Sequence, residues 1–279
     1  MKRWVSVLAL ASCLSGCNLF GDGAADPAGE ATPTTAAPDS AKTSGADAKS
    51  KSHSSGARAV ADETDDFVFK YAYPAPAGRI PELADLLDQR LEKQRSDLAT
   101  ESEDAKRGTR EQGFPYNKHS YNAEWKTVAD LPKWLSLSLD FSTYTGGAHG
   151  NYGLESLVWD KEGERAMDAE AMFTSPAALY DAFKTRYCTA LDRERTKRRN
   201  EGGGPPSTID AFNACPGIDE LGILVGSSNG RTFNRLTVYA GPYVAGPYVE
   251  GDYRIDLSID RAMLATVKPE FKDAFSARN

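Results

Sequence analysis

Apolar residues alternate with polar or small residues in several short stretches of the chain, and this period of two is typical of half-buried β-strands. The clearest stretch places Phe67, Phe69, Tyr71 and Tyr73 on one face. The same alternation predicts further strands at 121–127, 135–143, 154–160, 221–225, 233–240 and 255–259. Several of these strands follow one another after short turns, which favours an antiparallel meander.

Two longer stretches instead have the period of an amphipathic helix. A leucine stripe after Pro81 predicts a helix to about Arg107, and a second helix is predicted from Pro176 to a basic end near Arg199. Asp260 can cap a short closing helix. The predicted fold class is therefore α+β, a mainly antiparallel sheet with two longer helices, in one or two small lobes and preceded by a disordered tether.

The first 16 residues have the composition of a lipoprotein signal peptide. Lys2 and Arg3 give a basic start, an apolar run too short to span a bilayer follows, and small residues lead directly to Cys17. We expect cleavage after residue 16 and lipid on Cys17, with palmitate among the acyl chains. An ordinary cleaved signal with a chance cysteine is the alternative. Asn18 favours an outer-membrane lipoprotein that faces the periplasm.

Residues 17–64 are predicted to be a lipidated, disordered linker. From Gly21 to Thr64 there is no aromatic residue and no Leu, Ile or Met, so little apolar surface is available to offset the entropy of ordering. The formal net charge of −7 argues against nucleic acid as a partner. The folded body is expected at residues 65–279, with a first part at about 65–130 and a second part at about 131–279.

Cys188 and Cys215 are the two cysteines that remain in the folded body after maturation. Because an exported domain meets an oxidising compartment, we predict that they form one disulfide. It would close a loop of about 27 residues and constrain the unfolded chain by about 3 kcal/mol in the chain-entropy model. A pair of free thiols or a metal clip is the alternative.

The segment that begins at Tyr144 contains Gly146, Gly147 and His149. Glycines let a backbone approach a ligand closely and histidine titrates near neutrality, so these four residues are candidates for ligand binding. The alternative is a turn whose histidine bonds to nearby backbone. No nucleophile elbow or catalytic-cysteine context accompanies the histidine, and we assign no catalytic residue.

Neither metal nor cofactor is predicted. Zinc needs three or four ligands, and the folded body has two histidines without a His-Glu-x-x-His or paired Cys-x-x-Cys motif. Carboxylates are abundant, but no pattern nominates a glycosidase pair.

A repeated Gly-Pro-Tyr-Val sequence supplies four further candidates for ligand binding: Pro242, Tyr243, Pro247 and Tyr248. Proline fixes the backbone, and tyrosine offers a rigid amphipathic surface, a combination suited to recognition. The alternative is a bulged strand connection whose tyrosines pack on the sheet.

Three motifs in this order, Tyr144–Gly150, Met172-Phe173 and Gly246–Gly251, resemble the extracellular domain of RsiV-type anti-sigma factors. The same domain type precedes the catalytic domain of PdaC-type peptidoglycan deacetylases. The resemblance implies an α+β module of the cell envelope, non-catalytic in itself, which binds lysozyme in the sensor members. This sequence lacks the transmembrane and sigma-binding segments of the anti-sigma factors and the metal motif of the deacetylases, so neither activity is carried over.

We therefore expect a lipid-anchored envelope protein that binds a lysozyme-type hydrolase or peptidoglycan without turnover. An acidic body would favour its encounter with a basic hydrolase. The alternatives are an enzyme that acts on cell-wall glycan through His149, and a structural envelope lipoprotein.

Overall fold

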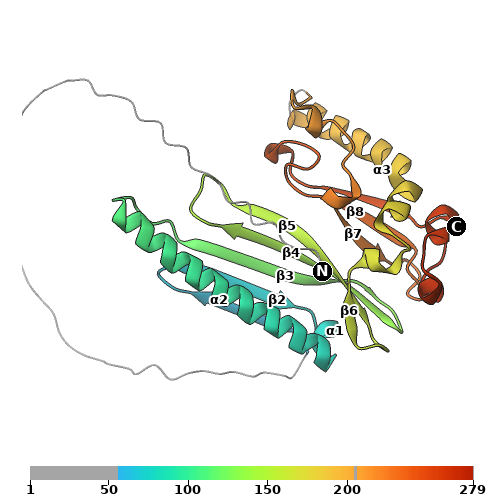
Figure 1. The fold of residues 1–279 in the computed structure, drawn as a ribbon, viewed down its shortest axis with the longest axis horizontal. Helices are drawn as coiled ribbons and strands as arrows, with labels where there is room; N and C mark the ends of the chain where they lie inside the picture. The colour runs from blue at the N-terminus through green and yellow to red at the C-terminus, as the bar shows by residue number, and fades with distance from the viewer. Residues whose placement is uncertain (1–55, 204–205, 279) are drawn as a thin grey trace, which may run out of the picture. The chain divides into compact units, whose positions relative to one another are not determined.

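The first half of the folded chain forms a six-stranded sheet (Figure 1). The computed structural model describes residues 56–203 and 206–278. Neighbouring strands of the sheet follow the chain in the order β1-β2-β3-β4-β5-β6. Their bounds are β1 (Arg58–Glu63), β2 (Phe67–Tyr73), β3 (His119–Asp130), β4 (Trp134–Tyr144), β5 (Asn151–Asp160) and β6 (Arg165–Met167).

Strands β2 and β3 are parallel, whereas the other neighbouring pairs of this sheet are antiparallel. A parallel pair needs a crossover connection, which α1 (Ala75–Gly78) and α2 (Pro81–Glu111) provide. Helix α2 lies along β2 and β3 (Figure 1), and its leucine stripe shares one core with the aromatic face of β2. Inside this core the Trp125 indole donates a hydrogen bond of 2.7 Å to the Tyr71 hydroxyl.

A second sheet has three antiparallel strands in the order β7-β8-β9. Helix α3 packs against β9 and begins at a Ser175 cap, whose hydroxyl accepts a hydrogen bond of 3.0 Å from the Ala178 N–H. The strands are β7 (Leu221–Gly226), β8 (Arg235–Ala240) and β9 (Tyr253–Ser258), and the helices are α3 (Pro176–Arg198) and α4 (Arg261–Ala265). Short helices complete this part: η1 (Ala169–Met172), η2 (Arg199–Gly203), η3 (Asp210–Phe212), η4 (Ile218–Glu220), η5 (Tyr248–Glu250) and η6 (Pro269–Ala274).

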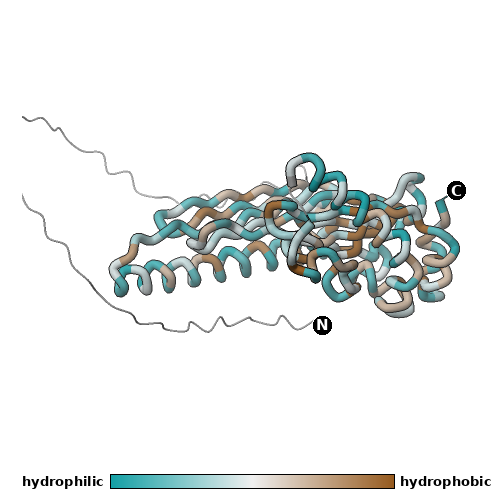
Figure 2. The backbone as a smooth tube through the Cα atoms, turned by 90° about the horizontal axis from the view of Figure 1, so that it is seen from above, coloured by the Kyte–Doolittle hydropathy of each residue, from teal (hydrophilic) through white to brown (hydrophobic). Residues whose placement is uncertain are grey.

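The two sheets contact each other through β7, which packs against β3, β4 and β5. Val158 of β5 is fully buried in the core of the second sheet. Hydrophobic and hydrophilic positions are interleaved along the strands (Figure 2), as the alternation in the sequence predicts. Within residues 56–203 and 206–278, no helix combines the length and the apolarity needed to cross a bilayer.

The α+β class, the two longer helices and the mainly antiparallel pairing are confirmed. The expected start of the folded body at residue 65 is wrong, because Arg58–Glu63 forms β1 inside the segment predicted to be disordered. This strand pairs with β2 through its backbone, and Arg95 on α2 forms an ion pair of 2.8 Å with Asp62, so no apolar stripe was required. Cys17 and most of the predicted linker lie outside the described residues.

The expected division near residue 130 is also wrong. It falls between β3 and β4, which pair with each other along most of their length. The change from one sheet to the other comes after β6, in the segment that contains α3.

Candidate functional site

The two segments that the sequence nominates for ligand binding meet in space. His149 lies in the loop between β4 and β5, and its imidazole stacks on the ring of Tyr248 with 4.1 Å between ring centroids. Tyr243 lies 5.5 Å from Tyr248, Tyr152 lies 6.0 Å from Tyr248, and Phe212 lies 6.4 Å from Tyr243, all between ring centroids. We call these five residues the aromatic cluster.

Hydrogen bonds fix the orientation of the rings. A carbonyl oxygen can only accept, so His149 donates from Nδ1 to the Gly150 carbonyl, 2.8 Å away. In the neutral imidazole, Nε2 is then an acceptor for the Tyr243 hydroxyl at 3.2 Å. The Tyr248 hydroxyl donates to the same Gly150 carbonyl at 2.9 Å. The cluster is thereby joined to the backbone of the loop between β4 and β5.

The loop between β8 and β9 presents Tyr243 in an uncommon backbone conformation. Its φ is +67°, in the left-handed region that side chains other than glycine rarely adopt. A hydrogen bond of 3.2 Å from the Val244 N–H to the Gly241 carbonyl closes the turn around it. Tyr243 is 48 % exposed and Val249 is 80 % exposed, so the loop presents apolar surface to solvent. Strained residues of this kind persist where the surroundings hold them, and they concentrate at functional sites.

Arginines at the basic end of α3 form hydrogen bonds with this loop. The buried Arg195 side chain donates hydrogen bonds of 2.7–3.0 Å to the carbonyls of Ala245, Asn213 and Ala214. Arg198 donates to the carbonyls of Glu250 and Asp252 at 2.8 and 2.6 Å. Besides complementing the carbonyl end of the helix, these cations therefore bind backbone carbonyls of the loop between β8 and β9.

Arg199 forms an ion pair with Glu250, which lies in η5 together with Tyr248. The distance from Arg199 Nε to Glu250 Oε1 is 2.9 Å, and the Glu250 side chain is 1 % exposed. The Tyr253 hydroxyl also donates to Glu250, and burial together with this carboxylate raises the pKa of Tyr253 to about 12. The absence of a side chain at Gly246 leaves room for this carboxylate, because a Cβ at this position would lie 2.4 Å from Glu250 Oε2.

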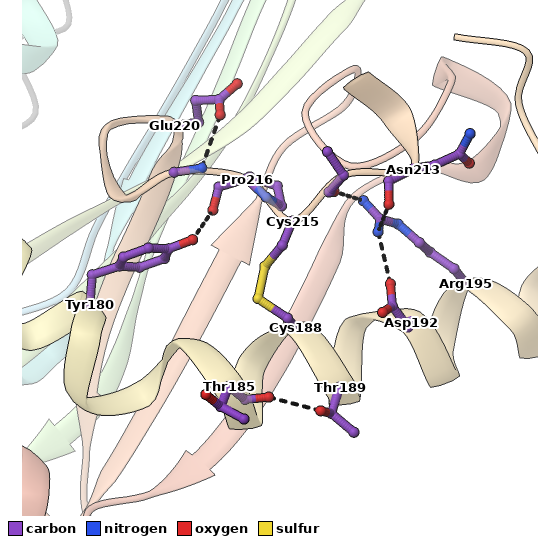
Figure 3. Close-up of a disulfide and its surroundings, with 12 residues drawn as sticks. Tyr180, Thr185, Cys188, Thr189, Asp192, Arg195, Asn213, Cys215, Pro216 and Glu220 are labelled. Carbon is purple, nitrogen blue, oxygen red and sulfur yellow. Dashed lines mark hydrogen bonds and ion pairs between the residues drawn. A yellow bond between two sulfur atoms is a disulfide. The ribbon is translucent and has the colours of Figure 1, made fainter. Parts of the chain in front are cut away.

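The predicted disulfide is present. Cys188 on α3 bonds to Cys215 with Cα atoms 5.5 Å apart, and the Tyr180 hydroxyl donates to the Pro216 carbonyl at 2.7 Å (Figure 3). Together with the bonds from Arg195 (Figure 3), these links attach the segment after η3 to α3. Phe212 at the end of η3 is thus positioned beside Tyr243.

The other candidate residues occupy supporting places. Tyr144 ends β4 opposite Ser120, and no ring contact within the described parts of the chain joins it to the aromatic cluster. Gly146 has a φ of +88° in the loop, while Gly147 faces open space. Pro242 lies in the turn of Tyr243, and Pro247 precedes η5 as its N-cap residue.

Sequence reasoning assigned no role to Tyr152, Phe212 or the arginines of α3 in holding the loop. A signal was available for the arginines, because residues three and four apart, such as 195, 198 and 199, share one face of a helix. For Phe212 the sequence holds no local signal, because its neighbour Tyr243 is distant in the chain.

Among the residues that the structure describes, His149 is not hydrogen-bonded to a carboxylate, which would orient a catalytic histidine. Both ring nitrogens have hydrogen-bond partners, a backbone carbonyl and a tyrosine hydroxyl, and neither partner is a carboxylate. Within residues 56–203 and 206–278, no group of three or more His, Cys, Asp or Glu side chains is placed to hold a metal ion.

One protein family is similar in sequence to most of the first sheet. The sequence model of the family described as deacetylase PdaC matches residues 60–152, from β1 to the start of β5. The resemblance to the PdaC-type domain is therefore confirmed, over that stretch of the chain. No curated protein matches the sequence.

Two solved structures are similar. One is a DUF3298 family protein from Pseudomonas aeruginosa PAO1, 15% identical, which covers 80% of this chain and 97% of that chain at a TM-score of 0.42. The other is a member of the DUF3298 family from Bacteroides fragilis NCTC 9343, 13% identical, which covers 76% of this chain and 91% of that chain at a TM-score of 0.41.

Proposed function

We propose that the protein is a lipid-anchored component of the cell envelope whose folded body binds a macromolecular ligand, a lysozyme-type hydrolase or peptidoglycan, without turning it over. The observation that carries this proposal is the aromatic cluster, in which His149, Tyr243 and Tyr248 from two distant loops form one partly exposed surface. Tyrosines of this kind are frequent anchors in recognition surfaces.

The surface is held in place before any ligand arrives. Arg198 and Arg199 fasten the loop that carries Tyr248, and the disulfide fastens the segment that carries Phe212. A binding surface that is already ordered loses less conformational entropy on association, which favours affinity. The positive φ of Tyr243 also fits a recognition role. Strained backbone conformations concentrate at functional sites, where the surrounding contacts offset their conformational energy.

Lipid on Cys17 would place this surface at a membrane outside the cytoplasm. The signal-like residues 1–16 and the apolar-poor residues 21–57 support an anchor followed by a linker, and Asn18 favours the periplasmic face of the outer membrane. The net charge of −7 would assist encounter with a basic hydrolase.

Binding is favoured over catalysis by the partners of His149. A general acid or base needs a free nitrogen directed at substrate, whereas both nitrogens of His149 are engaged within the aromatic cluster. The family model that matches residues 60–152 has the name of a deacetylase, and deacetylation is that protein's activity. Because both nitrogens of His149 are engaged, a glycan-acting enzyme that uses this histidine is the weaker alternative.

The test is capture by the mature chain without its lipid, residues 18–279, immobilised and offered lysozymes and purified peptidoglycan in separate experiments. The proposal expects retention of one of the two and release of no glycan fragments. Failure to retain either would leave a structural lipoprotein as the better account. Release of fragments that stops in His149→Ala would favour the enzyme.

A further inference from the structure

The face of the six-stranded sheet that is opposite α2 carries a groove of about 640 Å³. Its floor crosses β1 to β5, and Arg254 of β9 closes one side. A volume in this range is usual for pockets that hold small molecules or segments of a polymer. The sequence gives no motif for this groove.

The groove exists because small side chains occupy one end of this face. Residues on a strand alternate between faces, so Ala72 and Glu124, the chain neighbours of the α2-facing Tyr71 and Trp125, lie on the opposite face. On β1 and β2 the groove is lined by Ala59, Ala61 and Ala72, whose methyl groups leave the space unfilled.

Polar side chains line the rest of the groove, and their formal charges balance. Lys70 and Arg254 are cationic, whereas Glu124 and Asp140 are anionic. Asn122 adds an amide beside them. The groove therefore offers hydrogen-bond donors and acceptors without a net charge, which disfavours nucleic acid and other strongly charged polymers.

Asp140 is fixed in the groove by hydrogen bonds from two cationic side chains. Arg254 donates to Asp140 at 2.8 Å, and Lys126 donates to the same carboxylate at 3.0 Å. Burial alone would raise the pKa of Asp140, but the hydrogen bonds from Lys126 and Arg254 outweigh it and lower the pKa below its usual range. Asp140 is therefore an ionised acceptor in a fixed position.

Tyr152 joins the groove to the aromatic cluster. It lines the groove, and its ring also meets the ring of Tyr248 in a T-shaped contact with 6.0 Å between centroids. A ligand in the groove can thus continue onto the half-buried Tyr248 and the exposed Tyr243. This continuity fits a linear molecule better than a compact one.

We propose that the groove between Ala61 and Arg254 is a saccharide subsite that takes an uncharged, linear oligosaccharide, whose chain continues across Tyr152 to the aromatic cluster. The carboxylates and Asn122 provide partners for hydroxyl and amide groups, and the alanines and Tyr152 provide apolar contact for ring faces. The inference rests on the proposed binding function and narrows its ligand to a glycan.

The experiment blocks the groove without changing its charge. Ala61→Phe fills the floor from an exposed position of edge strand β1, and Ala166→Phe makes the same change at an exposed position of β6, at the other edge of the sheet. Binding of tetra-N-acetylchitotetraose and of the corresponding disaccharide is measured by calorimetry for the chain 18–279 and for both variants. Circular dichroism verifies that each variant is folded.

The proposal expects the tetrasaccharide to bind more tightly than the disaccharide, and Ala61→Phe to weaken the tetrasaccharide at least about tenfold while Ala166→Phe changes little. Equal losses in both variants, or no loss in a folded Ala61→Phe, would overturn the subsite. No binding of the tetrasaccharide by a protein that still captures a hydrolase would overturn the subsite alone. Capture of neither hydrolase, nor peptidoglycan, nor oligosaccharide would overturn the proposed function as well.

Discussion

The imidazole of His149 lies in stacking contact with the ring of Tyr248, with 4.1 Å between centroids and 25° between the ring planes. One residue belongs to the connection between β4 and β5 of the first sheet, and the other to the connection between β8 and β9 of the second. The hydroxyl of Tyr248 also bonds to the Gly150 carbonyl, so neither loop can rearrange without disturbing the other. The exposed aromatic surface is thus a joint property of both sheets.

The double substitution of Tyr243 and Tyr248 by Ala should weaken ligand binding by about 2 kcal/mol or more, because buried aromatic anchors dominate most interfaces. The fold should survive, since both residues lie in a surface loop. The measurement is the affinity for the ligand found by capture, with circular dichroism as the folding control.

Phe114→Ala is the matched control for that substitution. Phe114 is 65 % exposed in the loop after α2 and, among the described residues, makes no ring contact with the aromatic cluster, so its truncation should leave the affinity unchanged. His149→Ala should weaken ligand binding less than the double substitution of Tyr243 and Tyr248 does. If the folded double variant binds as tightly as the unmodified chain, the aromatic cluster is not the recognition surface.

Arg199→Met should destabilise the protein by about 3 kcal/mol, because it leaves the buried Glu250 carboxylate without its cation. Glu250→Gln removes that charge, so the double variant should lose less than the sum of the two single losses. Urea unfolding of the four proteins gives the coupling energy. Simple additivity would contradict a direct interaction that supports the loop.

Alternation in the sequence was sufficient to predict the strands that have one buried face. The aromatic run from Phe67 to Tyr73 became β2, and the run from Leu135 became β4, since burial on one side imposes the period of two directly. The cap at Asp260 was predictable for a similar reason, because its partner, the Met263 N–H, is three residues away.

Contacts between distant parts of the chain could not be predicted in this way. β1 has a mixed composition and is held by backbone pairing and by Arg95 of α2, neither of which leaves an apolar pattern. The parallel pairing of β2 with β3 depends on the crossover through α2. For the candidate site, sequence reasoning found His149 and Tyr248 as separate candidates, but nothing local indicates that they touch.

Replacement of Cys188 and Cys215 by Ala should lower the free energy of unfolding by about 3 kcal/mol, because the closed loop no longer restricts the unfolded chain. Chemical denaturation of the oxidised protein and of the variant measures the difference. A reducing agent should bring the unmodified protein close to the variant and leave the variant unaffected. Two titratable thiols in the unreduced, denatured protein would show that the bond is absent.

Asp140→Asn should lower stability at neutral pH, because the hydrogen bonds from Lys126 and Arg254 favour the charged carboxylate in the folded state. The folded-state pKa of Asp140 is lowered from 3.8, so its contribution is present above that pH and is lost as the pH falls through the folded-state pKa. The difference between the two proteins should therefore shrink in acid. Asp85→Asn, at an exposed position of α2, is the control and should change little at either pH. A difference that grows on acidification would contradict this account.

Cys17→Ala should yield a protein that carries no lipid, because the thiol that would accept the diacylglycerol is missing. The variant should remain as an unprocessed precursor or appear in the soluble fraction, whereas the unmodified protein should fractionate with membranes, since two or three acyl chains give an anchor that exchanges slowly. Labelling with radioactive palmitate checks the chemistry directly. Cys13→Ala is the control, because Cys13 lies within the predicted signal peptide and its loss should leave labelling intact. Palmitate on the Cys17→Ala protein would contradict the assignment of the lipid to this residue.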